Sequence, residues 1–199
     1  MGARVPFVGL TGGLGAGKSE ALRALDELGA ATLSTDEVVH ELLQTEELRE
    51  LVVGRFGPEV AEGGGVDRSK LAERAFAGPE GREWLEGELW PRVGGRVSEW
   101  RDAVDAADPP PRAAVVEVPL LFEAGMEQVF DRTLAVVADE DVRAERAGAR
   151  GHAALESRAG RQLSQDDKAM RADFVVRNDG TLDELREELS RVLGTIETE

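Results

Sequence analysis

The stretch that decides the fold of this chain is Gly12-Gly13-Leu14-Gly15-Ala16-Gly17-Lys18-Ser19. It fits the phosphate-binding loop, in which two glycines with four residues between them precede Lys and then Ser or Thr. Glycines adopt backbone conformations closed to other residues, so successive amide N–H groups can converge on phosphate oxygens at a helix N-terminus. Chance would produce this motif in only ~0.003 of chains of this composition, which disfavours the alternative of a flexible glycine turn.

Each residue type of the motif has a chemical task. Lys18 would reach the outer phosphates of a nucleotide, and Ser19 would ligate Mg²⁺. Lys18 is therefore a candidate catalytic residue, and Ser19 is the candidate metal ligand. The candidate nucleotide-binding residues are those of the loop and the position that follows it: Gly13, Leu14, Gly15, Ala16, Gly17, Lys18, Ser19 and Glu20.

Apolar runs on both sides of the motif predict an α/β fold. Residues 5–10 read as a short buried strand before the loop, and residues 19–28 read as a helix after it. Further strands are predicted at residues 30–33, 113–118, 133–137 and 174–176. Because apolar strands alternate with helical stretches, we expect a central parallel sheet with helices on both faces, the three-layer arrangement of a P-loop NTPase.

Two helix boundaries carry capping signals. Thr181 and Glu184 form a capping-box pattern at the start of the last helix, where apolar residues follow at helical spacing. Residues 26–29 spell the DxxG pattern of a GTPase switch, but they lie at the end of the first helix, where Gly29 would serve as a C-cap. Neither Lys70 nor Lys168 lies in the Asn/Thr-Lys-x-Asp pattern of guanine recognition, so that specificity is absent.

Length, composition and charge restrict the function classes. The chain has 199 residues, which predicts one domain, and its 40 acidic and 24 basic side chains give a formal charge of -16. That charge repels nucleic acids and anionic membranes. The longest mostly apolar run, residues 113–122, is interrupted by Glu117 and is about half of the ~20 residues that span a membrane. With no signal-peptide pattern and no Cys, we expect a cytoplasmic protein without nucleic-acid or membrane partners.

Two segments interrupt the predicted core. Residues 36–106 look mostly helical and charged, with breaks expected at Gly54, Gly57-Pro58, Gly63-Gly64-Gly65 and Pro91 and an end at Pro109-Pro110-Pro111. Residues 139–172 form a second helical stretch. The single domain would then have a core of about residues 1–35, 112–138 and 173–199, a helical insertion at 36–111 and a lid at 139–172.

Arginine is concentrated in the second of these segments, at positions Arg143, Arg146, Arg150, Arg158, Arg161 and Arg171. Guanidinium groups match phosphate oxygens in a bidentate fashion, so the segment could close over the transferring phosphates. The alternative is a solvated helix face, in which the arginines pair with the acidic residues Glu140, Asp141, Glu145 and Glu156.

Asp36 follows the apolar segment at residues 30–33. If that segment is a strand of the sheet, its carboxyl end opens toward the phosphate crevice, and the carboxylate could accept a hydroxyl proton. Phosphoryl transfer needs one such group. Ser34 and Glu37 also form a capping-box pattern around Asp36, so helix capping is an equal alternative.

Together with later motifs, these features give the chain a resemblance to the dephospho-CoA kinase family that runs nearly end to end. The family's opening motif is matched by residues 10–19, and the second Asp of its Asp-x-Asp pair is matched by Asp36. Its later motifs are matched in order by Leu85-Glu86, Trp90-Pro91, residues 119–123, Gln162, Lys168, Ala172-Asp173 and Asn178-Asp179-Gly180. The chain departs from the family pattern at Ser34, Trp90 and Glu20.

The resemblance implies transfer of the γ-phosphoryl group of ATP to the ribose 3′-hydroxyl of dephospho-CoA, the last step of coenzyme A synthesis. It implies Asp36 as the catalytic base, Arg146 as a catalytic arginine and Arg150 as an ATP-binding arginine of the lid, and Asn178 as a residue beside the adenine. ATP and Mg²⁺ are the implied cofactors. Dephospho-CoA is the implied small-molecule partner, held by the helical insertion.

The departures have physical interpretations. Glu20 would repel the α-phosphate unless it points to solvent, which we expect because a first-turn Glu suits the helix dipole. Trp90 could line the acceptor site, but a Trp at helical spacing is more often a core residue. Two alternative functions are a kinase of another small hydroxyl acceptor and a nucleotide-binding regulatory protein with little turnover. The intact Lys18, Ser19 and Asp36 argue against the second.

Overall fold

The computed structural model describes residues 4–148 and 162–198. The chain divides into two compact units. One consists of Met1–Ser34 together with Trp100–Glu199, and the other is Thr35–Glu99. The sequence predicts an insertion at 36–111. The second unit begins one residue before that segment, at Thr35, and ends twelve residues before its end, at Glu99.

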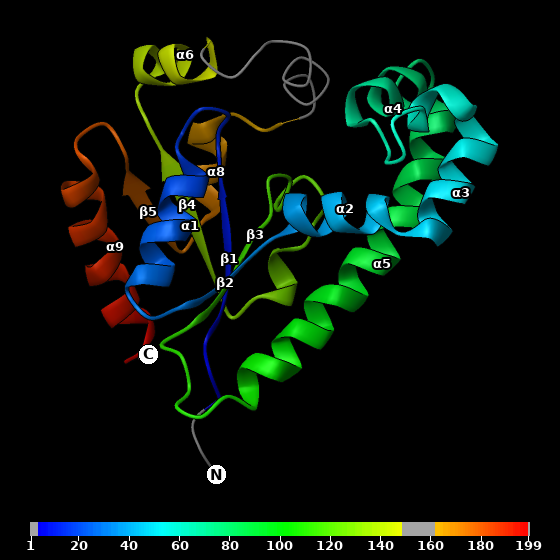
Figure 1. Cartoon of the computed structure of the whole chain (residues 1–199). Coiled ribbons are helices and arrows are strands. Elements are labelled where there is room, and N and C mark those ends of the chain that lie inside the picture. Colours follow the sequence, from blue (N-terminus) through cyan, green and yellow to red (C-terminus); the bar gives the residue numbers. More distant parts are fainter. Residues whose placement is uncertain (1–3, 149–161, 199) are drawn as a thin grey trace. The chain divides into compact units, whose positions relative to one another are not determined.

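The first unit is built on a five-stranded parallel sheet (Figure 1). Its strands are β1 (Phe7–Gly12), β2 (Ala31–Ser34), β3 (Ala114–Glu117), β4 (Arg132–Val137) and β5 (Phe174–Arg177), in the order β2-β3-β1-β4-β5. Every residue of β1 and β3 is buried. Apart from Thr11 and Glu117 near their carboxyl ends, these two strands read as apolar runs in the sequence, as central strands of a covered parallel sheet do.

One layer of helices covers the face of the sheet formed by Val8 and Leu10 of β1. Here α1 (Lys18–Glu27) and α9 (Leu182–Ile196) contact each other and bury apolar side chains, Leu25 and Leu189 among them, in the same core cluster. α9 also contacts β5, and α1 contacts β1, β2 and β3. Successive residues of a strand face opposite sides of the sheet, so Gly9, between Val8 and Leu10, faces the other side, which a second layer covers.

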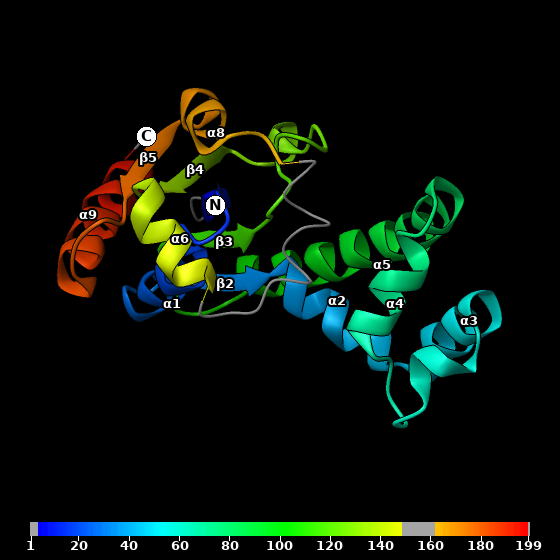
Figure 2. The same cartoon turned by 90° about the horizontal axis from the view of Figure 1, so that it is seen from above.

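The opposite face of the sheet is covered by α8 (Gln165–Arg171) and by the chain between β3 and β4, which includes the short helix η2 (Glu127–Val129). Thr11 of β1 lies within hydrogen-bond distance of Lys168 on α8, and a Cβ added at Gly9 would collide with Leu121 and Phe130. Figure 2 shows α1 and α9 on one side of the sheet and α8 on the other. The predicted three-layer α/β fold is confirmed.

Both predicted helix boundaries of this unit are confirmed. The Thr181 side chain accepts a hydrogen bond from the backbone N–H of Glu184, whose carboxylate accepts one from the backbone N–H of Thr181. α1 ends at Glu27, with Leu28 as its C-cap. Gly29, the next residue, has a φ of +93° and donates its N–H to the carbonyl of Asp26, while Ala30 donates to Leu25. This pair of bonds is a Schellman motif, so the DxxG stretch is a helix end.

The second unit is helical. It contains α2 (Thr35–Gln44), α3 (Glu46–Phe56), the short helix η1 (Pro58–Ala61), α4 (Arg68–Ala75) and most of α5 (Pro79–Asp105). The side chains of Thr45 and Asp67 cap α3 and α4. Apolar residues from each of these elements are buried, including Leu43, Val52, Val60, Leu71 and Leu85.

Two of the predicted helix breaks are wrong. Gly54 lies within α3, and Pro91 lies inside α5. Proline leaves one carbonyl of the preceding turn without its helical donor; Pro91 is exposed, so that carbonyl can bond to water instead. Although α5 has 27 residues, neither it nor any other helix in residues 4–148 and 162–198 is long and apolar enough to cross a membrane.

Candidate nucleotide-binding site

The glycine-rich loop connects the end of β1 to the start of α1, which is the arrangement predicted for a phosphate-binding loop. Gly15 and Gly17 have φ values of +74° and +91°, in the left-handed region that favours glycine. A Cβ at Gly15 would meet the backbone of Arg143, and one at Gly17 would collide with the side-chain amide of Asn178. The conformation and the close neighbours therefore both require glycine here.

Lys18 is folded back over the loop that precedes it. Its ammonium donates to the carbonyls of Gly12 and Gly13, both at 3.1 Å. Ser19, in the first turn of α1, is exposed. A positive charge and a hydroxyl thus lie at the N-terminus of a helix, whose free N–H groups and dipole attract anions.

Glu20 forms an ion pair with Arg23 one turn along α1. Both side chains are at least one-third exposed. The carboxylate that would repel a phosphate is therefore held by a cation at the helix surface, as expected for a residue that points to solvent.

α6 (Glu140–Gly148) lies against the loop through its arginines. Arg143 donates from Nε to the carbonyl of Leu14 at 2.8 Å, and its guanidinium also pairs with Glu140 at 2.9 Å. Arg146 donates to the carbonyl of Asn178 at 2.9 Å. The contact of Arg143 with the loop is one that the sequence did not assign.

Asn178 connects the end of β5 to the same loop. It follows β5 directly, is buried, and donates from its side-chain amide to the carbonyl of Ala16 at 2.9 Å. The structure thereby brings Arg146 and Asn178 to the loop, from which each is more than a hundred residues away in the chain. Arg150 lies outside the described residues, as do Arg158 and Arg161.

Two buried charged side chains at this edge of the sheet received no role from the sequence reasoning, although Lys168 was recognised there as a match to a family motif. Glu117 is the last residue of β3, paired in register with Leu10 and Ser34. Lys168 of α8 is completely buried and pairs with Glu123 at 3.0 Å. Burial lowers the pKa of Lys168, and the Glu123 carboxylate opposes that shift. A Glu at the end of an otherwise apolar strand was the available signal for Glu117.

Two sequence-predicted residues lie in the helical unit. Asp36 is the second residue of α2, which begins directly after β2 ends at Ser34. Trp90 lies on α5 with 52% of its surface exposed. The expectation that Trp90 is a core residue is wrong: the neighbouring buried side chains of α5 are Leu85 and Leu89, and Trp90, one position after Leu89, lies off that buried side.

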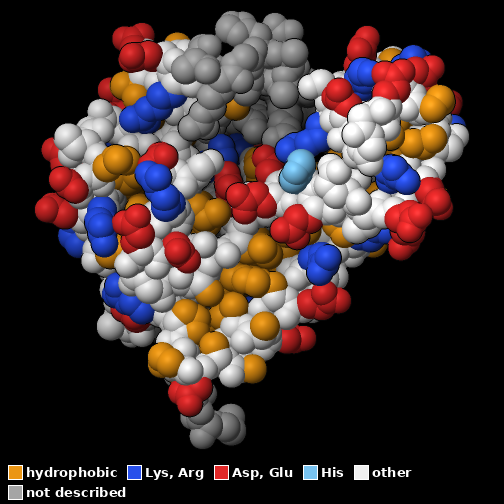
Figure 3. All heavy atoms as spheres, in the orientation of Figure 1, with side chains coloured by type: hydrophobic (Ala, Val, Ile, Leu, Met, Phe, Trp, Pro, Cys, Tyr) orange, Lys and Arg blue, Asp and Glu red, His pale blue; other side chains and the backbone are white. Residues whose placement is uncertain are grey.

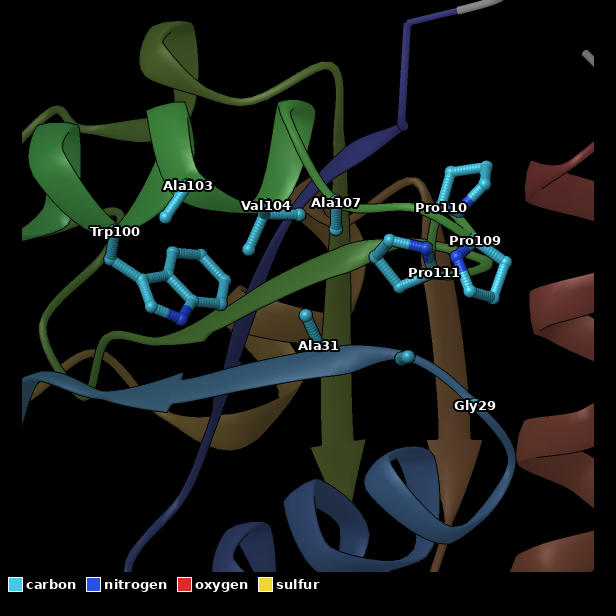
Figure 4. Close-up of a pocket in the computed structure, with 10 residues that line it drawn as sticks. Gly29, Ala31, Trp100, Ala103, Val104, Ala107, Pro109, Pro110 and Pro111 are labelled. Carbon is cyan, nitrogen blue, oxygen red and sulfur yellow. The ribbon is translucent and has the colours of Figure 1, made fainter.

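A separate pocket of about 510 Å³ lies at the opposite edge of the sheet. Ala31, the first residue of β2, lines it together with Trp100 and Val104 of α5 and the three prolines Pro109, Pro110 and Pro111 (Figure 4). Figure 3 shows hydrophobic side chains gathered where the end of α5 and the start of β2 lie. No residue of the glycine loop lines this pocket, and it offers no charged group for a phosphate.

A parallel α/β sheet whose first strand leads through a glycine-rich, lysine-containing loop into a helix defines a P-loop nucleotide-binding protein of the kinase type. Residues 6–184 match the family model described as dephospho-CoA kinase. The chain belongs to the dephospho-CoA kinase family and is therefore a phosphotransferase.

Individual relatives agree with this assignment. A dephospho-CoA kinase of Protochlamydia amoebophila is 38% identical over 187 residues, covering 92% of each chain. The crystal structure of TT1252 from Thermus thermophilus superposes with a TM-score of 0.79 at 31% identity, covering 97% of this chain and 98% of the other. A Campylobacter jejuni dephospho-CoA kinase, at 22% identity, a TM-score of 0.64 and coverage of 99% and 100%, shares the fold.

Proposed function

We propose that this protein transfers the γ-phosphoryl group of ATP to the ribose 3′-hydroxyl of dephospho-CoA, giving coenzyme A and ADP. The observation that carries the proposal is the glycine loop with Lys18 folded over it, in a chain of this family. The acceptor hydroxyl attacks the γ-phosphorus, the bond from that phosphorus to the bridging oxygen breaks, and ADP leaves with the bond electrons. The hydroxyl proton passes to a base.

Positioning and charge neutralisation are the main tasks of the protein in such a transfer. The backbone N–H groups of the loop would hold the phosphates, and the Lys18 ammonium would turn from the carbonyls of Gly12 and Gly13 to the phosphate oxygens. Lys18 then stabilises charge that develops on the transferring group.

The residues at the loop also fit Mg²⁺. No group of three or more His, Asp or Glu side chains among the described residues could hold a metal by itself. Mg²⁺ bound with a nucleotide needs no such cage, since it takes most of its ligands from phosphates and water. Ser19 would supply the protein ligand from the first turn of α1. Glu117 is a buried carboxylate at the end of β3, in register with Leu10 of β1. When bound, the ion neutralises the β- and γ-phosphate charge.

Asp36 is the proposed base, because it follows β2 by two residues and a carboxylate can accept the hydroxyl proton. Arg146 is the proposed charge-stabilising arginine. It already lies beside the loop through the Asn178 carbonyl. Asn178 is proposed to border the adenine, and Arg150 stays a predicted phosphate ligand.

The acceptor-binding part is proposed to be the helical unit Thr35–Glu99. Its surface exposes large apolar side chains, with Trp90 the most suited to stack on the adenine of dephospho-CoA. The proposal assigns Trp90 the role of an exposed stacking platform.

The test is ADP release from Mg·ATP by the purified protein, with and without dephospho-CoA. Release should depend on the acceptor, and mass spectrometry of the product should find coenzyme A. Coenzyme A itself, which already carries the 3′-phosphate, is the matched control and should stimulate no release. Equal ADP release with and without dephospho-CoA would overturn the proposal. Faster release with another hydroxyl compound would identify a different acceptor.

A further inference from the structure

Lys168 is a completely buried cation with three polar partners from distant parts of the chain. Its ammonium donates to the carbonyl of Pro119 at 2.6 Å and lies 3.5 Å from the Thr11 hydroxyl and 3.0 Å from a carboxylate oxygen of Glu123. Thr11 is itself fully buried and lies 3.4 Å from the same Pro119 carbonyl. The Lys168 ammonium is thus surrounded by the Pro119 carbonyl, the Thr11 hydroxyl and the Glu123 carboxylate, near the carboxyl ends of β1 and β3.

The ammonium joins the strand ends that form the nucleotide site. Thr11 immediately precedes Gly12, whose carbonyl accepts a bond from Lys18. Pro119 follows β3 by two residues, beyond Glu117. One buried ammonium therefore bridges the strand that leads into the loop and the strand whose last residue is the buried carboxylate.

The same helix is anchored to a third strand and to Glu123. Gln165 of α8 exchanges two hydrogen bonds with the backbone of Ala138, just after β4. The Glu123 oxygen that pairs with Lys168 also accepts the N–H of Leu163 at 2.8 Å. α8 is thereby fixed to the carboxyl ends of β1, β3 and β4.

The Lys168 ammonium has three N–H donors, and the pair with Glu123 satisfies one of them. The Pro119 carbonyl and the Thr11 hydroxyl are the acceptors for the others. Replacing a buried pair by apolar groups is often neutral or stabilising, so charge burial alone is a weak reason to keep one. Burial lowers the pKa of Lys168, which is the cost of holding the charge there. The bonds of Lys168 to Pro119 and Thr11, which Glu123 does not make, distinguish the lysine from its partner.

We propose that Lys168 is a positioning residue for phosphoryl transfer: its ammonium holds the end of β1, from which the glycine loop departs, against the backbone that follows β3. The proposal rests on the function proposed above. A small displacement of reacting groups lowers the rate of transfer strongly even where binding persists. Lys168 therefore acts through the loop and has no contact with substrate.

The first experiment separates stability from turnover with three variants. Lys168→Met removes the ammonium and leaves the Glu123 carboxylate buried without its cation. Glu123→Gln removes the carboxylate but leaves Lys168 to bond Pro119 and Thr11. The double variant removes both charges, and Gln at position 123 can still accept the Leu163 bond.

Thermal midpoints should fall in both single variants and recover in the double variant, because no unpaired buried charge remains. The kcat should nonetheless stay at least about tenfold below wild type in the double variant, with the KM for ATP changed less than about threefold. Glu123→Gln should lose less kcat than Lys168→Met. A double variant with recovered stability and wild-type kcat would overturn the proposal.

A second pair of variants keeps the test decisive if Lys168→Met does not fold. Thr11→Val replaces the hydroxyl by a methyl group of similar size, whereas Thr11→Ser keeps the hydroxyl. The kcat should be lower in Thr11→Val than in Thr11→Ser, at ATP KM values close to each other. Equal kcat values in the two variants would overturn the proposed role.

Failure of this inference and failure of the proposed function give different results. If the proposed function is wrong, the wild-type protein shows no ADP release that depends on dephospho-CoA. If only the positioning role is wrong, the wild type is active and kcat in the variants follows the fraction of folded protein, measured by circular dichroism at the assay temperature.

Discussion

The carboxyl edge of the sheet and the helical unit Thr35–Glu99 use different kinds of polar contact. At the sheet edge, buried hydrogen bonds join residues far apart in the chain, as between Asn178 and Ala16. In the helical unit, ion pairs such as Lys70 with Glu62 lie at the surface. An exposed pair contributes only ~0–1 kcal/mol, whereas a buried polar group that loses its partner costs about 1–3 kcal/mol. The edge is therefore built for fixed geometry.

The difference fits the different tasks that the proposed function gives to the two regions. Phosphoryl transfer requires groups held in fixed positions, which long-range buried bonds provide. A surface that binds a large acceptor needs exposed apolar area, and in the helical unit Trp90 is the side chain proposed to supply it. Substitutions at the edge should thus change kcat, and substitutions on the helical unit should change the KM of the acceptor.

The largest effect is expected for Lys18→Ala, which should lower kcat by about 10³-fold, since it removes a charge that acts on the transferring group. The matched control is Lys70→Ala in the helical unit, where the lysine only pairs with Glu62 at the surface. Acceptor-dependent ADP release should be near wild type in the control. Thermal midpoints should change little in either variant. Comparable losses of activity in Lys18→Ala and Lys70→Ala would contradict the proposed difference between the sheet edge and the helical unit.

The next largest effect is expected for Asp36→Asn, with kcat lowered about 10²-fold and the KM for ATP little changed, as loss of a positioned base predicts. Asn has the size of Asp and keeps one side-chain oxygen acceptor, so this substitution removes the base while hydrogen bonding in the first turn of α2 stays possible. Asp67→Asn is the control, because Asp67 caps α4 through the N–H groups of Ser69 and Lys70. Wild-type kcat in Asp36→Asn would leave helix capping as the role of Asp36.

An intermediate effect is expected for Trp90→Ala. If the indole stacks on the acceptor's adenine, its removal should raise the KM for dephospho-CoA about tenfold, since base–aromatic stacking contributes ~1–3 kcal/mol. The KM for ATP should stay the same. Phe76→Ala removes another exposed aromatic ring, 44% exposed against 52% for Trp90, in the same unit. An equal rise in both variants, or none in Trp90→Ala, would remove Trp90 from the acceptor site.

The regions also differ in how far the sequence predicts them. The glycine loop, its flanking strand and helix, and the Gly29 cap follow from contiguous residues, so local patterns were sufficient. The partners of Lys168 are residues 11, 119 and 123, which only the folded sheet brings together. Arg143 and Leu14 are 129 positions apart in the chain, so local sequence patterns could not predict their contact either.

In the helical unit the local patterns themselves misled. Pro91 was expected to break a helix, yet α5 continues through it because that position is exposed. Trp90 was expected in the core because an amphipathic pattern indicates a buried face, but only part of this long helix is covered. Burial on a long helix depends on which neighbours pack against it, and the sequence alone does not give that information.

The smallest effect is expected for Glu184→Gln, which removes the carboxylate from an exposed capping contact in the unit that contains the sheet. It tests whether the stability that a polar contact contributes depends on its burial or on the unit in which it lies. The Glu184 carboxylate accepts bonds from the backbone N–H of Thr181 at 2.8 Å and from its hydroxyl at 3.0 Å. These bonds lower the pKa of Glu184 below its ordinary value of 4.5.

In the unfolded chain Glu184 titrates near its ordinary pKa, so the folded protein gains stability from the carboxylate above that pH and loses it as pH falls through the lower folded pKa. The thermal midpoint of Glu184→Gln should therefore lie slightly below wild type at neutral pH, and the difference should close as the solution is acidified past that lower pKa. Melting curves followed by circular dichroism measure both. The control is Glu187→Gln, an exposed glutamate of α9 outside the capping box. A large, pH-independent loss would mean that an exposed bond can be as important as the buried ones, and the contrast between the sheet edge and the helical unit would no longer rest on burial.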